Sequence, residues 1–128
     1  MFFLITIYLA WSSQTPLSTL VLSLFECKKD LNINQTIIDE VVDEKGRITK
    51  PLDVIKELYV CGFKKADFLD EHGNIIYDKY SEVMIYASKK NSSIIIDALS
   101  KCKDVKGDES GETIIKSLNC LIDYGGFP

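Results

Sequence analysis

The sequence predicts an all-α domain of six short helices, and three observations support this fold class. From Leu17 onward, apolar residues recur three and four positions apart in segment after segment, which is the spacing of one helix face. Short polar stretches that contain capping residues, proline or glycine separate these segments. The only β-like run, residues 94–96, lies inside a helical stripe, so no segment favours a strand.

Start and stop signals bound the first three predicted helices. The first is expected over 17–29, directly after Pro16. The second begins near Asn34, a capping residue type, and ends at Gly46. The third begins at Pro51, because proline is tolerated in the first turn of a helix. The apolar positions that share a face within these segments are Leu20, Leu24 and Cys27, then Ile37, Ile38, Val41 and Val42, then Val54, Leu58 and Cys61.

Similar signals bound the last three predicted helices. Asp78 is expected to cap the fourth, and the fifth ends near Cys102. The sixth opens near Ser110 and stops at the glycine pair 125–126. The apolar stripes of these segments are Tyr80, Val83, Met84 and Ala87, then Ile95, Ala98, Leu99 and Cys102, then Ile114, Ile115, Leu118, Leu121 and Ile122.

Composition and charge limit the classes of function. The chain has 128 residues and 46% hydrophobic content, which suits one domain with a buried core. Its net charge is −4 and its Lys and Arg residues are spread along the chain, so no basic patch predicts a nucleic-acid partner. A single histidine, His72, and the absence of a Gly-rich phosphate loop leave little material for catalysis. We therefore expect no enzymatic activity and no cofactor.

The N-terminal segment differs from the rest because its first charged side chain is Glu26. Residues 2–10 are an apolar run too short to span a bilayer, so stable membrane insertion is not expected. Ala10 and Ser12 place small residues at the positions that signal peptidase prefers. We predict a signal peptide over 1–12, a mature domain over 13–128 and a secreted, extracellular protein. An uncleaved start, or an apolar segment extended through 17–25, is the alternative.

Four cysteines, Cys27, Cys61, Cys102 and Cys120, fall on the first, third, fifth and sixth predicted helices. In an oxidising compartment an even number of cysteines predicts structural disulfides, and their spacing leaves all three pairings open. No two cysteines stand close enough for a C-x₂₋₄-C zinc knuckle or a CxxC redox pair. A calcium loop centred on Gly73 fails too, since Phe68 and Lys79 would occupy ligand positions. No metal site is predicted.

Two stretches of the sequence resemble a known family. Residues 59–75 contain a cysteine, a hydrophobic pair, acidic residues, a glycine and Asn-Ile in the family's order, and residues 111–120 form the second match. The chain is similar there to the insect odorant-binding proteins of the pheromone-binding and general odorant-binding class. Members usually have six cysteines, and two of those positions are Glu57 and Gly111 here. The sequence thus resembles the four-cysteine C-minus subgroup, which implies the pairs Cys27–Cys61 and Cys102–Cys120.

This resemblance implies a carrier that holds a small hydrophobic odorant or pheromone in an internal apolar cavity and brings it to a chemosensory receptor. The helical stripes suggest which residues line the pocket, although each one fits an ordinary core position as well. These candidates are Val54, Leu58, Tyr80, Val83, Met84, Ala87, Leu99, Leu118, Ile122 and Phe127. Tyr80 and Tyr124 could offer a hydroxyl to the ligand. The sequence leaves a monomer and a homodimer equally open.

The alternative function is a secreted helical signalling or venom-type protein that acts on a protein partner and has a solid core.

Two smaller expectations concern single residues. His72 lies in a predicted loop, so ligand affinity should respond weakly to acid between about pH 7 and 5. Glu57 either caps the backbone N–H groups at 111–113 from a distance or is solvated.

Overall fold

The computed structural model describes residues 16–87 and 92–124, and these form an all-α fold. The predicted signal peptide and Phe127 lie outside the described residues. Within the described ranges there is no strand, and only two isolated backbone bridges occur. The helices are α2 (Pro16–Asp30), α3 (Gln35–Val41), α4 (Asp53–Lys65), α5 (Tyr77–Ala87), α6 (Ser92–Cys102) and α7 (Ser110–Asp123). The predicted fold class is confirmed, and the described residues contain the six predicted helices.

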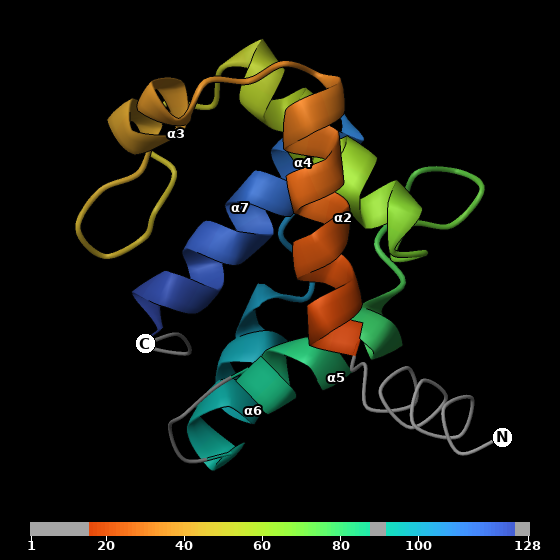
Figure 1. Ribbon diagram of the computed structural model, residues 1–128. Coiled ribbons are helices and arrows are strands. Elements are labelled where there is room, and N and C mark those ends of the chain that lie inside the picture. The colour runs from red at the N-terminus through yellow and green to blue at the C-terminus, as the bar shows by residue number, and fades with distance from the viewer. Residues whose placement is uncertain (1–15, 88–91, 125–128) are drawn as a thin grey trace, which may run out of the picture.

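Five of the helices form a closed ring of contacts, and Figure 1 shows α2, α4 and α7 together in its upper part, with α5 and α6 below them. One side of α4 packs against α2 and another against α7. The pair formed by α5 and α6 completes the bundle, since α5 contacts α2 and α6 contacts α7. The short helix α3 lies at the periphery. No helix in the described part of the chain is long and apolar enough to cross a membrane.

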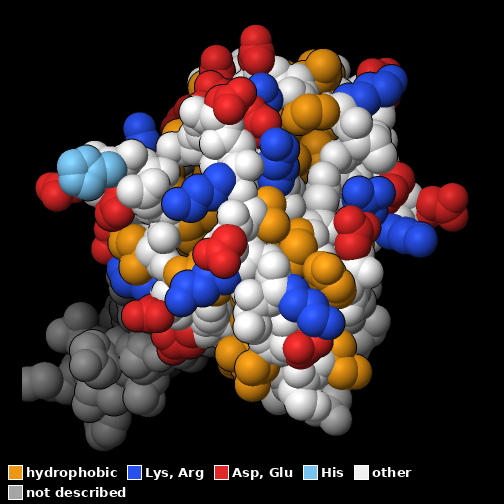
Figure 2. All heavy atoms as spheres, turned by 180° about the vertical axis from the view of Figure 1, so that it is seen from behind, with side chains coloured by type: hydrophobic (Ala, Val, Ile, Leu, Met, Phe, Trp, Pro, Cys, Tyr) orange, Lys and Arg blue, Asp and Glu red, His pale blue; other side chains and the backbone are white. Residues whose placement is uncertain are grey.

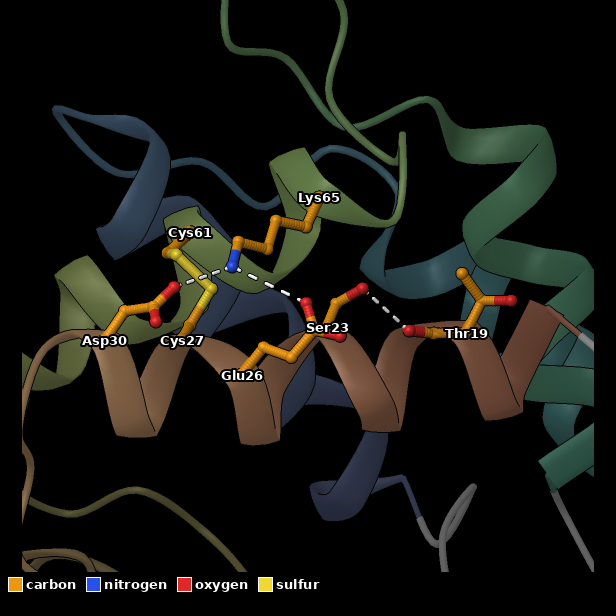
Figure 3. The surroundings of a disulfide bond; sticks show 7 residues. All are labelled: Thr19, Ser23, Glu26, Cys27, Asp30, Cys61 and Lys65. Atoms are coloured by element: carbon orange, nitrogen blue, oxygen red, sulfur yellow. Dashed lines mark hydrogen bonds and ion pairs between the residues drawn. A yellow bond between two sulfur atoms is a disulfide. The ribbon is translucent and has the colours of Figure 1, made fainter.

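Two disulfides connect helices that are distant in the sequence. Cys27–Cys61 joins α2 to α4, and Cys102–Cys120 joins α6 to α7, which confirms the pairing that the resemblance implied. Beside the first disulfide, Lys65 Nζ lies 2.8 Å from Asp30 Oδ2 on α2 (Figure 3). With 34 and 18 residues of separation, the chain-entropy model assigns each cross-link about 3 to 4 kcal/mol.

The buried apolar side chains form three clusters. The main core cluster lies between α2, α4, α5, α6 and α7, and its largest members include Phe63, Tyr80, Ile95, Ile114 and Leu121. A second cluster attaches α3 and the following loop to α4 and α7 through Val41, Ile48, Ile55 and Ile115. The third cluster consists of Cys27, Ile33 and Leu58, between α2 and α4. The first disulfide is therefore part of the core.

The second helix ends earlier than the sequence predicts, at Val41 instead of Gly46. Asn34 is its cap, as expected, and accepts a hydrogen bond from the backbone N–H of Thr36. Val42 is extended and bridges to Ile48, because the intervening loop folds into a tight turn. The Asp43 carboxylate stabilises that turn by accepting hydrogen bonds from two backbone N–H groups, at 45 and 47. These contacts compete with further helical turns.

Two helix starts also differ from their predicted positions. Helix α4 begins at Asp53, two residues after Pro51, because Leu52 is extended and its carbonyl accepts the first hydrogen bonds of the helix. Helix α5 begins at Tyr77, so Asp78 lies in the first turn and is not the cap. An acidic residue in the first turn still stabilises the positive end of the helix dipole. The glycine pair predicted to stop α7 lies outside the described residues.

Candidate ligand-binding site

A pair of buried hydroxyl groups lies inside the main core cluster. Tyr80 on α5 has no exposed surface, and Ser117 on α7 is 2% exposed. The Ser117 hydroxyl donates a hydrogen bond of 3.1 Å to the Tyr80 hydroxyl oxygen. The pair carries two O–H protons, and the described residues provide an acceptor for only one of them. One of the two buried O–H groups therefore has no acceptor among the described residues.

Aromatic and aliphatic side chains surround this hydroxyl pair. The Tyr80 ring lies 5.5 Å from the ring of Tyr77 and 6.2 Å from that of Phe63. The Tyr77 hydroxyl donates a 2.6 Å hydrogen bond to the backbone carbonyl of Leu99, which fixes α5 against α6. Burial raises the pKa of Tyr80 well above its ordinary value. At neutral pH the phenol thus stays a neutral hydrogen-bond donor.

A cleft of about 460 Å³ reaches Ser117, one member of the hydroxyl pair, whereas Tyr80 lies behind it and does not line the cleft. Ser117 is the buried part of the lining, and residues 72–75 and 103–109 form the rim. The Ser110 hydroxyl, at the start of α7, donates a 2.7 Å hydrogen bond to the Gly73 carbonyl. This bond joins α7 to the loop that contains Gly73 at the rim of the cleft. Ile75 and Val105 pack against the main core cluster at the same cleft. The volume is in the range of small-molecule sites.

The predicted lining residues are divided between the clusters. Four of them, Tyr80, Val83, Met84 and Leu99, belong to the main core cluster, and Leu118 packs against it. Leu58 belongs to the third cluster, and Val54 packs against the second and third. Ile122 is partly buried. The side chains of Ala87 and Phe127 lie outside the described residues, and the internal cavity itself stays a prediction.

Ser117 is absent from the predicted lining residues, although the sequence contains a signal for it. It is a hydroxyl residue inside the apolar stripe of 114–122. Its partner lies 37 positions earlier, so only the packing of α5 against α7 reveals the pair. Tyr124, the other candidate hydroxyl, is 51% exposed and lies under the Lys101 ammonium group, away from the core.

His72 lies at the rim of the cleft, away from the buried hydroxyl pair, and Glu57 does not line the cleft. The His72 side chain is 77% exposed, and its nearest charged neighbour is Glu71. Among the described residues Glu57 has no hydrogen bond or ion pair, so the predicted remote cap does not form. Lys56 instead pairs with Glu109, with 3.4 Å between Nζ and Oε1. A Cβ atom at Gly111 would lie 2.7 Å from the Lys56 Cβ, so the backbones of α4 and α7 approach each other closely at this point.

On one face of the protein (Figure 2), the charged side chains of the described residues do not form a patch of one sign. On the face shown in Figure 2, acidic and basic side chains alternate, with apolar side chains between them. This pattern lacks the continuous positive surface that binds nucleic acid. The described residues also contain no group of three or more His, Cys, Asp or Glu side chains that could hold a metal ion.

A comparison with models of protein families identifies the family to which this chain belongs. A model described as the PBP/GOBP family matches residues 20–124, which covers all described helices except the first turn of α2. The chain belongs to the PBP/GOBP family. This family consists of secreted carriers of small hydrophobic molecules such as odorants and is not a family of enzymes. No curated protein and no solved structure matches the chain significantly. Assignment to the four-cysteine subgroup of the PBP/GOBP family stays a prediction.

Proposed function

We propose that this PBP/GOBP protein is a carrier for a small hydrophobic molecule that has one neutral oxygen acceptor. The observation that carries the proposal is the Tyr80–Ser117 pair, two buried hydroxyl groups of which Ser117 lines an open cleft and Tyr80 lies directly behind it. Burial of the ligand's apolar part provides affinity, at about 25 cal/mol per Å² of surface. The hydroxyl pair orients the ligand oxygen, so aldehydes, ketones, esters and alcohols fit best. Delivery to a chemosensory receptor is the step that such a carrier serves.

A displacement assay tests this proposal. A fluorescent apolar probe, N-phenyl-1-naphthylamine, is bound to the mature protein and displaced by octanal or by octane. We expect octanal to displace the probe better than octane, because only the aldehyde accepts the free O–H. Tyr80→Phe should weaken octanal binding about fivefold, the value of one neutral hydrogen bond, and leave octane unchanged. Tyr86→Phe is the control, since Tyr86 is 64% exposed.

Two results would contradict the proposal. A wild-type protein that takes up no probe would favour the alternative function, a helical protein with a solid core that acts on a protein partner. An unchanged preference for octanal in Tyr80→Phe would place the ligand elsewhere.

We also propose that residues 1–12 are removed as a signal peptide. The two disulfides support this, because disulfides form and persist in oxidising compartments. N-terminal sequencing of protein secreted by insect cells should begin at Ser13. Retention in the cells, or an intact Met1 on the secreted protein, would rule out this cleavage.

A further inference from the structure

A second apolar groove lies on a different face, between α2, α3 and α4. Its volume is about 230 Å³, below the roughly 300–1,000 Å³ of most small-molecule sites. We refer to it as the α2–α3 groove. Its apolar wall consists of Val21, Leu24, Phe25, Ile38, Leu58 and Tyr59. None of these residues lines the cleft that reaches Ser117, so the two sites are separate.

The apolar wall of the α2–α3 groove is unusually open to solvent. Phe25 is 64% exposed and Val21 is 41% exposed. Both side chains expose apolar surface to water. A ligand that covered this surface would gain binding free energy in proportion to the apolar area it buried. Leu58, by contrast, is 6% exposed and forms the floor of the groove. The hydrocarbon chain of a ligand that lay against Phe25 would therefore also pack near Leu58, a member of the third core cluster.

One cation lies at the edge of this groove. Lys28 is the only charged residue in its lining, which includes no carboxylate. The Lys28 ammonium donates a 2.6 Å hydrogen bond to the Gln35 side-chain oxygen, and the Gln35 amide donates to Asp39. Among the described residues Lys28 has no ion-pair partner, whereas Lys65 on the neighbouring helix has two carboxylates. An occupant with an anionic group would complete the interactions of Lys28.

Tyr59 provides a second polar contact at the groove. The ring packs against the main and second core clusters while it also lines the groove. Its hydroxyl has no hydrogen-bond partner in the described part of the chain. Burial raises the pKa of Tyr59, so the group remains an O–H donor at neutral pH. A ligand oxygen in the groove could accept a hydrogen bond from this O–H group.

From these contacts we infer that the α2–α3 groove binds a linear aliphatic carboxylate, with its anionic head at Lys28 and its chain against Phe25. The small volume suits a chain of medium length that stays partly exposed. This site does not depend on the carrier function proposed for Tyr80, because the two share no residue. It would let the protein hold a fatty acid and a neutral ligand at the same time.

Titration of the ¹⁵N-labelled mature protein with decanoate, followed by NMR, tests the inference. Decanoate should shift backbone signals of α2 and α3, and decanol should bind about fivefold more weakly because it lacks the charge. Decyltrimethylammonium should bind less well still. Saturating octanal should leave the decanoate affinity unchanged, since it occupies the other site.

Matched variants locate the head and the chain. Lys28→Gln should reduce decanoate affinity to that of decanol, whereas Lys29→Gln, a change at the exposed neighbour outside the groove, should not. Phe25→Ala should weaken decanoate and decanol alike, and Tyr86→Ala, at a residue of equal exposure on α5, should weaken neither. Tyr80→Phe should leave decanoate unchanged, so failure of one proposal is distinguishable from failure of the other.

Several results would overturn the inference. If the wild type bound decanoate and decanol equally well, Lys28 would not contribute to the binding of the carboxylate. Shifts confined to α5 and α7 would show that decanoate enters the Tyr80 site. Sedimentation that shows a dimer abolished by Phe25→Ala and unaffected by decanoate would identify a second copy of the chain as the occupant.

Discussion

The Asn119 side chain on α7 connects two distant parts of the chain by hydrogen bonds to the backbone of Ile48. Its side-chain oxygen accepts a hydrogen bond from the Ile48 N–H, and its side-chain N–H donates to the Ile48 carbonyl, both at 2.9 Å. Ile48 belongs to the second core cluster and is 5% exposed. One amide therefore holds the loop after α3 against α7.

Asn119→Ala should lower the free energy of unfolding by about 1 to 3 kcal/mol, because it leaves a partly buried N–H and carbonyl without partners. Urea unfolding followed by circular dichroism measures this. Lys116→Ala is the control on the same helix, and it should change stability by less than about 1 kcal/mol, since its pair with Glu112 is at the surface. If the two variants were equally stable, water would satisfy Ile48 as well as Asn119 does.

The contact between α2 and α4 depends on a glycine in the middle of α4. A methyl group at Gly62 would clash with Leu24 Cδ2 and lie 2.9 Å from Leu24 Cγ. Glycine is unfavourable in a helix interior by about 1 kcal/mol relative to alanine. The close approach of the two helices, which the Cys27–Cys61 disulfide also requires, offsets that cost.

Gly62→Ala should therefore destabilise the protein by about 1 to 2 kcal/mol, since overpacking outweighs the gain in helix propensity. The same change in a Leu24→Ala background should be neutral or stabilising by up to about 1 kcal/mol, because the obstructing side chain is gone. Thermal and urea unfolding of the four proteins in this double-mutant cycle give the coupling energy. A coupling energy near zero would mean that α2 and α4 separate easily.

For the whole molecule, titration of buried and hydrogen-bonded groups determines how stability depends on pH. Burial raises the pKa of Tyr80 and Tyr59. Above about pH 10 the unfolded chain loses these protons while the folded chain retains them, so stability falls as pH rises. A backbone hydrogen bond from Asn74 lowers the pKa of Asp70, and a hydrogen bond from Lys116 lowers that of Glu112. Stability is thus also lost as pH falls below about 4.

Urea midpoints measured from pH 3 to 11 should accordingly show a plateau between about pH 5 and 9 with losses on both sides. Tyr80→Phe should reduce the alkaline loss and leave the acid loss unchanged, which separates the two causes. A fall of the wild-type midpoint between pH 7 and 5 as large as the fall below pH 4 would show that a group outside this set controls stability.

Much of the fold could be predicted because it depends on local patterns. Apolar spacing marks all six helices, and the start of α3 at its Asn34 cap is local too. Helix ends were less predictable where a tertiary contact intervenes. Helix α3 stops at Val41 because Val42 pairs with Ile48, and no residue between 37 and 42 encodes that pairing. The site shows the same limit, since apolar stripes locate buried positions but do not distinguish core from pocket wall.

The sequence by itself determined that the chain is all-α, that four cysteines form structural disulfides, and which segments are helical. These features depend on residue type and on spacing within a single segment. Only the tertiary structure decided that Tyr80 meets Ser117, that Lys28 lies beside an apolar groove and that Glu57 does not cap α7. Each of these depends on the angle and distance at which two helices cross, which side chains from distant segments set jointly through packing.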